Sequence, residues 1–223
     1  MNHDAPQETE LPDDDAHYPR VVGVGPWPGG REAWPTEPHF DPELLELGDR
    51  RNVLDGYRYW RLEAIVAELD TRRHPLHVAF ENLEHDMNIG SIVRTANAYN
   101  VAGVHVIGRR RWNKRGAMVT DRYLTVHHHP DAASFASWAR EAGIAVVAID
   151  NTAGSTPMEV GGLPRDAVLV FGSEGPGLSE DLLAAAEQVR HITQHGSTRS
   201  INAGAAAAIA MYAWASEHVT IAT

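Results

Sequence analysis

The chain has no cysteine among its 223 residues. This absence excludes disulfide bonds, thiolate metal sites and cysteine nucleophiles, and it agrees with an intracellular setting. No apolar run approaches the roughly 18 residues that a membrane-spanning helix needs, so no membrane partner is expected. The N-terminal residues are acidic and rich in proline, not basic and then apolar, so we expect no signal peptide.

Basic residues are also scarce, since 19 Lys and Arg stand against 30 Asp and Glu and the net charge is −11. Such a balance at first argues against a nucleic-acid partner, because phosphate binding depends on Lys and Arg. The deficit is local, however, because residues 1–49 alone carry 12 acidic and 2 basic side chains. The rest of the chain is close to neutral, and its charge excludes little.

The N-terminal region has the composition of a flexible segment. Residues 1–42 contain 8 of the 13 prolines and show no apolar periodicity. We interpret residues 1–49 as an acidic, proline-rich arm that is largely disordered or loosely docked. A helical extension over residues 50–73 is expected to follow, with a helix from about residue 50 to residue 69. Arg51, Arg58 and Arg61 would share one face of that helix, which could meet phosphate or only solvent.

From residue 74 onward, apolar strand-like runs alternate with helical patterns. Strands are predicted at residues 76–80, 104–107, 144–149, 167–171 and 189–192. Helices are predicted at residues 89–99, 134–143, 179–188 and 201–217, with Ser134 and Ser179 as N-caps of the second and third. The alternation predicts one α/β domain over residues 74–223, a mostly parallel sheet flanked by helices.

Three polar clusters interrupt this pattern where strands end or helices begin, the places where α/β sheets bind ligands. The first contains Asn88, Gly90 and Arg94, of which Asn88 could cap a helix and Arg94 could pair with a structural carboxylate. The second is the glycine-rich loop at residues 172–177, which lacks a Walker lysine and could also be an ordinary turn. The third places Ser200 and Asn202 before an alanine-rich helix, where both could be simple caps.

Together, the three clusters resemble the SpoU-type, TrmH-like branch of the SPOUT RNA methyltransferases. The motifs that carry the resemblance are Asn88/Gly90/Arg94, Gly172/Glu174/Gly175/Gly177 and Ser200/Ile201/Asn202. It extends over about residues 76–219. Two positions depart from the family pattern: Thr193-Gln194 replaces a usual Pro-Met pair, and Gly204 replaces a frequent serine. These departures concern the detail of the cofactor pocket.

The resemblance implies a SPOUT-type fold with a C-terminal trefoil knot, a homodimer, and methylation of a ribose 2′-hydroxyl in tRNA or rRNA with S-adenosylmethionine as cofactor. It also implies site residues. Those expected to be catalytic are Arg94, Glu174, Ser200 and Asn202. Those expected to bind the cofactor are Gly172, Ser173, Glu174, Gly175, Ile192, Ile201 and Asn202.

The role of Arg94 can be narrowed by its chemistry. A guanidinium has a pKa above about 12, so it is a poor general base. We therefore favour Arg94 as a holder of RNA phosphate and a stabiliser of the developing alkoxide, with Ser200 or a water relaying the proton.

An RNA substrate needs a basic surface, and residues 108–129 offer six basic side chains and one acidic one. Trp112 lies among these arginines, as is typical of loops that bind unpaired RNA. The predicted RNA contacts are Asn88, Arg94, Arg109, Arg110, Arg111, Lys114, Arg115 and Arg122. His127, His128 and His129 do not predict a metal site, because consecutive side chains cannot all point one way.

Two other functions compete with this interpretation. One is a non-catalytic protein of the same fold that binds RNA and S-adenosylmethionine, and the other is an enzyme that binds nucleotide phosphate in the loop at residues 172–177. The lack of a long preceding RNA-recognition domain slightly favours tRNA over rRNA, and a cytoplasmic location is expected. The acidic arm is either an inert tail or a segment that competes with RNA for the basic loop.

Overall fold

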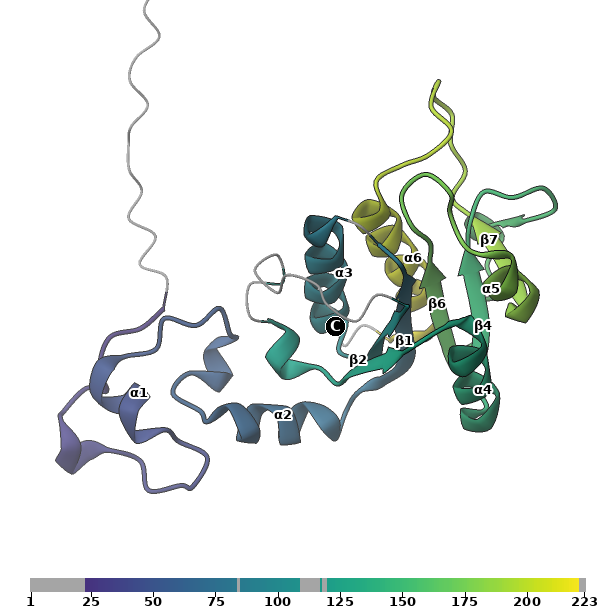
Figure 1. Ribbon diagram of the computed structural model, residues 1–223. Helices are drawn as coiled ribbons and strands as arrows, with labels where there is room; N and C mark the ends of the chain where they lie inside the picture. Colours follow the sequence, from purple (N-terminus) through teal and green to yellow (C-terminus); the bar gives the residue numbers. More distant parts are fainter. Residues whose placement is uncertain (1–22, 84, 109–116, 118–119, 221–223) are drawn as a thin grey trace, which may run out of the picture. The chain divides into compact units, whose positions relative to one another are not determined.

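The computed structural model describes residues 23–83, 85–108, 117 and 120–220 (Figure 1). The chain divides into two compact units, the first ending at Arg61 and the second beginning at Leu62. This division differs from the expected boundaries after residues 49 and 73. The reason is that residues 23–61 form a folded unit of their own.

The first unit contains η1 (Arg31–Ala33), α1 (Pro42–Leu47) and η2 (Asp55–Tyr57). The ring of Trp27 makes edge contacts with Phe40 and Tyr59, at centroid distances of 5.8 and 5.2 Å. The expectation of a largely disordered arm is therefore wrong for residues 23–49. Residues 1–22 lie outside the described residues.

The predicted helix over residues 50–69 is wrong in its first half, because the helix α2 spans only Leu62–Asp70. The buried carboxylate of Asp49 accepts two hydrogen bonds from the guanidinium of Arg51, at 2.9 and 2.7 Å. Arg58 and Arg61 donate to backbone carbonyls at 2.6 and 3.0 Å. These arginines thus hold a non-helical chain in place, and the helix face that they were expected to share does not form.

The second unit is an α/β domain, as predicted. Its strands pair in parallel throughout the described residues, in the order β3-β2-β1-β6-β4-β7-β5. The strands are β1 (His74–Glu81), β2 (Val101–Ile107), β3 (Val126–His129), β4 (Ala145–Ile149), β5 (Thr156–Pro157), β6 (Ala167–Phe171) and β7 (Gln188–His191). The helices that follow α2 are α3 (Asp86–Ala98), η4 (Thr120–Tyr123), α4 (Ala132–Ala142), η5 (Met158–Val160), α5 (Glu180–Ala185) and α6 (Ala203–His218).

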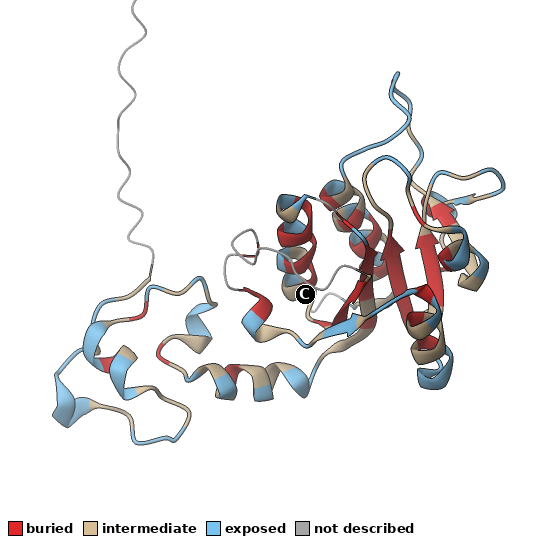
Figure 2. Cartoon of the chain, viewed as in Figure 1, coloured by how far each residue is buried: buried red, intermediate tan, exposed pale blue. Residues whose placement is uncertain are grey.

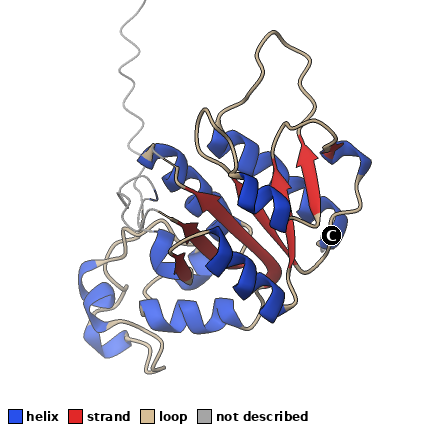
Figure 3. Ribbon diagram, turned by 45° about the vertical axis from the view of Figure 1, so that its right-hand side comes forward, coloured by secondary structure: helices blue, strands red, loops and turns tan. Residues whose placement is uncertain are grey.

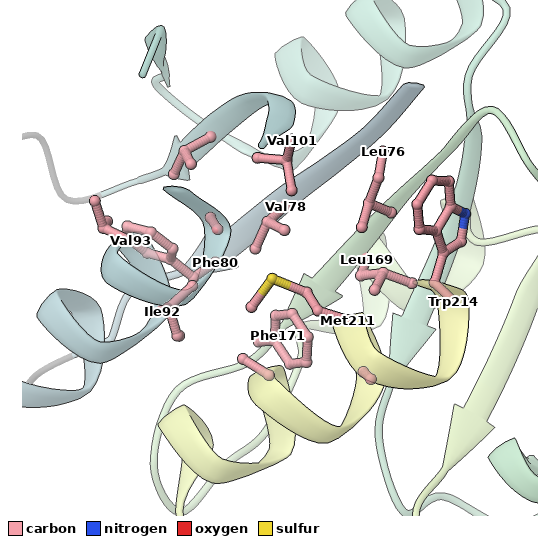
Figure 4. Close-up of a cluster of buried hydrophobic side chains, with 14 of the residues drawn as sticks. Leu76, Val78, Phe80, Ile92, Val93, Val101, Leu169, Phe171, Met211 and Trp214 are labelled. Carbon is pink, nitrogen blue, oxygen red and sulfur yellow. The ribbon is translucent and has the colours of Figure 1, made fainter. Parts of the chain in front are cut away.

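Helices cover both faces of the sheet (Figure 3). One core lies between the sheet and helices α3 and α6, and it includes Phe80, Leu169 and Met211 (Figure 4). The other core lies between the opposite face and helices α4 and α5. Strand β6 is buried at every residue (Figure 2), which explains why its sequence is continuously apolar.

Several element boundaries differ from the sequence predictions. Helix α4 is capped by Asp131, which accepts from the amide of Ser134 at 2.8 Å, so Ser134 is not the N-cap. Helix α5 has the predicted cap at Ser179 but ends at Ala185, because the chain enters β7 soon afterwards. The short strands β3 and β5 were not predicted, since His127–His129 and a proline are atypical of strands.

Small residues let helix α6 lie close to helix α3. A methyl group added at Gly204 would lie 3.0 Å from the Cβ of Ser91, closer than side chains normally approach. Further along α6, Ala207 and Ala210 are fully buried. Gly204, one of the departures from the family pattern, is therefore explained by this close contact between the two helices.

A row of histidines crosses the β3 edge of the sheet, and we call His77, His105 and His129 the histidine ladder. Nδ1 of His77 lies 3.0 Å from Nε2 of His105, and Nδ1 of His105 lies 2.9 Å from Nε2 of His129. The ring of His127 stacks on that of His105 at 4.7 Å. Among the described residues, no group of three or more histidines, cysteines or carboxylates is placed to hold a metal ion.

Candidate active site

A cavity of about 690 Å³ opens at the carboxyl ends of β4, β6 and β7. Its volume lies within the range of typical small-molecule sites. It brings together the ends of three neighbouring strands and the beginnings of α3 and α6. The lining residues are His85, Asn88, Ile149, Asp150, Asn151, Phe171, Gly172, Ser173, Glu174, Gly175, Pro176, Gly177, His191, Ile192, Gln194, Arg199, Ser200, Ile201, Asn202, Ala203 and Ala206.

The glycine-rich loop after β6 forms one wall of this cavity. Ser173 and Gly177 exchange two backbone hydrogen bonds, each 3.1 Å long, which close the loop into a tight turn. A Cβ at Gly172 would collide with the backbone of Gly177 and Leu178. Gly177 has a φ of 77°, a conformation that favours glycine. The glycines are therefore required by the loop geometry.

Two carboxylates hold the far end of this loop. Asp150 accepts from the amide of Leu178 at 2.9 Å, and Glu81 accepts from the amide of Ser179 at 2.8 Å. Both carboxylates come from the carboxyl ends of strands, β1 for Glu81 and β4 for Asp150. The loop is thus tied to the sheet on both sides of β6.

Hydrogen bonds join the three sequence motifs into one network. The carboxamide of Asn88 donates to Glu174 at 2.6 Å and accepts from Asn202 at 2.8 Å. Asn202 in turn caps α6 by accepting from the amide of Ala205 at 3.1 Å. Asn88 and Glu174 are separated by 86 positions in the sequence, and Asn88 and Asn202 by 114 positions. They nevertheless meet at one edge of the cavity.

Asn88 has a different position from the predicted one. Helix α3 already begins at Asp86, so Asn88 lies inside its first turn and does not cap it. The side chain is only 8% exposed, and both ends of its carboxamide are engaged within the site. Its polar atoms are thus used to position Glu174 and Asn202, and the RNA contact of Asn88 stays a prediction.

The loop between β7 and α6 is anchored at both ends. Thr193 donates its amide and its hydroxyl to Glu159 at 3.2 and 3.0 Å. Hydrogen bonds from the backbone of Glu159 and from Thr193 hold the pKa of this carboxyl below its usual range. Asn151 donates to the carbonyl of Arg199 at 3.1 Å. The threonine that replaces the usual proline thus fastens the loop through Glu159.

Most of the predicted site residues meet at this cavity. Those that line it are Gly172, Ser173, Glu174, Gly175, Ile192, Ser200, Ile201 and Asn202. Arg94 does not line it and is exposed on α3. Arg122 is exposed on η4. The other predicted RNA contacts (Arg109, Arg110, Arg111, Lys114 and Arg115) lie outside the described residues.

Sequence reasoning missed six polar residues that line the cavity: Asp150, Asn151, His85, His191, Gln194 and Arg199. The first two directly follow β4, so the rule that ligands bind at the carboxyl ends of strands would have found them. His191 ends β7, and Gln194 is in the loop that follows. No local pattern distinguishes them, because their place depends on β7 pairing beside β4.

The cavity suits a nucleoside that carries positive charge. Asp150 and Glu174 line it, and its basic lining residues are Arg199 and two histidines, with no lysine, so the lining is not strongly positive as the phosphates of the nucleotide-dependent alternative would require. The turn at Gly172 lets backbone approach a ligand closely, and Gln194 has a buried Oε1 atom with no protein partner among the described residues. These features fit S-adenosylmethionine, whose sulfonium is cationic and whose adenine carries N–H donors.

Fold and site together define an α/β protein that binds its ligand at the carboxyl edge of a parallel sheet. Residues 75–212 match the SpoU rRNA Methylase family. The chain therefore belongs to the SpoU rRNA methylase family. This confirms the resemblance drawn from the three motifs, together with the α/β fold class, the enzyme class and the S-adenosylmethionine cofactor of that family. The trefoil knot stays a prediction from membership of the family.

Individual relatives are moderately similar. A tRNA (guanosine(18)-2′-O)-methyltransferase of Borreliella burgdorferi is 25% identical over 77% of this chain and 79% of its own length. An uncharacterized tRNA/rRNA methyltransferase of Mycolicibacterium vanbaalenii is 30% identical over 70% of this chain, but the match spans only 51% of that protein. The AdoMet-bound rRNA methyltransferase of Sinorhizobium meliloti superimposes with a TM-score of 0.61 and 26% identity, covering 68% of this chain and 61% of that one.

None of the helices in the described part of the chain has both the length and the hydrophobicity to span a bilayer.

Proposed function

We propose that the protein is an S-adenosylmethionine-dependent RNA methyltransferase that modifies a ribose 2′-hydroxyl. The observation that carries this proposal is the hydrogen-bond network from Glu174 through Asn88 to Asn202. This network brings the three family motifs to one cavity, which would be unnecessary if each motif were an isolated cap or turn. Three of the four residues proposed as catalytic, Glu174, Ser200 and Asn202, therefore lie together at the cavity, which favours an enzyme over a non-catalytic binding protein.

The cofactor is assigned to the cavity wall formed by the two loops. Gly172, Ser173 and Gly175 would hold it from one side, and Ile192 and Ile201 from the other, with Glu174 and Asn202 at the motif network. The bound cofactor supplies an electrophilic methyl group on sulfur. The contribution of this chain is to align the acceptor oxygen with that methyl group, which calls for a rigid site.

The acceptor hydroxyl must lose its proton while its oxygen forms the new bond to carbon and the carbon–sulfur bond breaks. Ser200 lines the cavity and is assigned to relay that proton, directly or through water. Arg94 is exposed on the helix that begins at the cavity, so it is assigned to the RNA phosphate and to the charge that develops on the oxygen. Removal of this charge partner should slow transfer without preventing cofactor binding.

The RNA is proposed to be tRNA in preference to rRNA. Among the described residues, Arg94 and Arg122 are the exposed basic side chains proposed to bind the RNA. The other proposed basic contacts belong to the segment at residues 109–115. The catalytic domain is assigned to residues 74–223, which include the whole of the family match. A cytoplasmic location is proposed, because a chain without cysteine suits a reducing compartment.

Incubation with labelled S-adenosylmethionine and separated tRNA and rRNA tests this function. We expect label in tRNA, located on a ribose oxygen after nuclease digestion. Arg94→Ala should lower turnover by about 100-fold or more, as the loss of a charge-stabilising donor does in other enzymes. Arg94→Lys should also be impaired, because lysine lacks the bidentate geometry. Near-normal turnover of Arg94→Lys would contradict the assigned role, and an absence of label in both RNA pools would contradict the function.

A homodimer is proposed on an exposed apolar stripe of α6. Ile209 and Tyr212 are 43% and 65% exposed on this alanine-rich helix. Met87 and Ile201, which flank the hydrogen-bonded pair of Asn88 and Asn202, are exposed as well. Exposed apolar side chains are typical of protein interfaces, and a twofold dimer uses the same surface on both copies.

The Tyr212→Asp variant tests this interface. A buried, unpaired carboxylate opposes association, so we expect dissociation of the dimer to become at least about 10-fold more favourable. Analytical ultracentrifugation at micromolar concentrations measures it. Leu54→Asp, which places the same charge on an exposed leucine of the first unit, is the matched control and should leave the dimer intact. A monomeric wild-type protein at these concentrations would contradict the proposal.

A further inference from the structure

The side chain of Gln194 is unusual among the polar groups of the cavity. Its Oε1 atom is buried and has no hydrogen-bond partner among the described residues. Buried acceptors are nearly always paired in folded proteins, because an unpaired one loses its hydrogen bonds to water without replacement. In this structure the atom has almost no accessible surface, so a ligand reaches it only after the side chain turns. Because Gln194 lines the cavity, a donor on a bound ligand would then be the missing partner.

The backbone around Gln194 is held in place on both sides. Its neighbour Thr193 is tied to Glu159 by two hydrogen bonds, and Asn151 holds the far end of the loop at Arg199. The carboxamide is therefore presented from a loop whose backbone is anchored on both sides. Such preorganisation lowers the entropic cost of a ligand contact.

The chemistry of a carboxamide narrows the ligand group. It presents an acceptor oxygen beside a donor nitrogen, which matches the edge of adenine, where the 6-amino group lies beside a ring-nitrogen acceptor. The amino-acid ammonium of the cofactor is a weaker candidate, because the carboxylates in the same cavity, Asp150 and Glu174, would attract it more strongly.

We propose that Gln194 recognises the adenine of the cofactor, with Oε1 accepting a hydrogen bond from the 6-amino group. This inference rests on the proposed function and adds a residue that selects the base of the cofactor. The proposal gives a role to Gln194, which occupies the position where the family pattern has methionine. Methionine has a similar length but no carboxamide, so chains with that residue would lack this contact.

Binding calorimetry with two ligands tests the proposal. One is S-adenosylhomocysteine, and the other is its analogue with hydrogen in place of the 6-amino group. The wild-type protein should bind the analogue about 10-fold more weakly, because Oε1 then stays buried without a donor. Gln194→Met should lose this discrimination and bind the two ligands with similar affinity. Thermal unfolding of the variant checks that its fold is retained.

His195→Ala is the matched control, because His195 is the next residue in the same loop, is exposed and does not line the cavity. It should keep the 10-fold preference. The proposal is overturned if Gln194→Met retains the wild-type preference, or if the wild-type protein binds both ligands equally. If the wild-type protein binds neither ligand, the proposed cofactor itself is wrong, and the role of Gln194 falls with it.

Discussion

Replacement of Gly172 by alanine is expected to weaken cofactor binding by about 100-fold, the equivalent of about 3 kcal/mol of strain that binding must overcome. The added Cβ would collide with the backbone of Gly177 and Leu178, and backbone cannot yield as a flexible side chain can. The turn closed by Ser173 and Gly177 must then open, and the wall of the cavity moves. Calorimetry with S-adenosylhomocysteine measures the loss.

The matched control for this variant is Gly196→Ala, in the loop between β7 and α6. A Cβ at Gly196 meets nothing within 4 Å, and its backbone is not in the left-handed region. The affinity of the Gly196→Ala protein for S-adenosylhomocysteine should therefore stay within about 2-fold of that of the wild type. A folded Gly172→Ala protein with wild-type affinity would contradict the idea that this tight turn shapes the cofactor site.

Acidification is expected to destabilise the protein steeply through the histidine ladder. Burial and the neighbouring histidine His127 lower the pKa of His77 from 6.5 to about 4. Burial and the surrounding histidines lower the pKa of His105 to about 2. Below pH 6.5 the unfolded chain binds protons at these positions while the folded chain does not, so the free energy of unfolding falls as the pH falls.

The size of the effect follows from the same linkage. Each of the two groups contributes a loss of about 1.4 kcal/mol per pH unit once the pH is well below 6.5. Between pH 6.5 and 4.5 the two together should therefore remove about 4 kcal/mol, a large part of the stability of a typical domain. Urea unfolding at a series of pH values measures this loss.

His105→Leu provides the sharper comparison. This variant removes the fully buried member of the ladder, so its unfolding free energy should vary less with pH between 6.5 and 4.5 than that of the wild type. The comparison uses the slope against pH, so it does not depend on the stability cost of the substitution itself. His195→Ala, in a distant loop, is the control. Equal slopes for His105→Leu and wild type would show that the ladder does not cause the acid sensitivity.

The α/β class and the main strands were predictable because they depend on local patterns. Strand β6 is continuously apolar, since it is buried on both faces, and the cap at Ser179 is visible in the residues that follow it. The glycine-rich loop and the cap at Asn202 were also recognisable from their residues alone. The helix predicted from residue 50 failed because Asp49 and the nearby arginines bind one another in a non-helical arrangement.

The amino-acid sequence by itself thus determined five of the seven strands, most helices and the three motifs, because each depends on periodicity or on a few neighbouring residues. Only the tertiary structure decided that Asn88 links Glu174 to Asn202, that Gln194 lies in the cavity, and that His105 is buried in a ladder. These contacts follow from the strand order, which places residues far apart in the chain beside one another. The physical reason is that strand order reflects the burial of both sheet faces together, a property of the whole domain that no short segment carries.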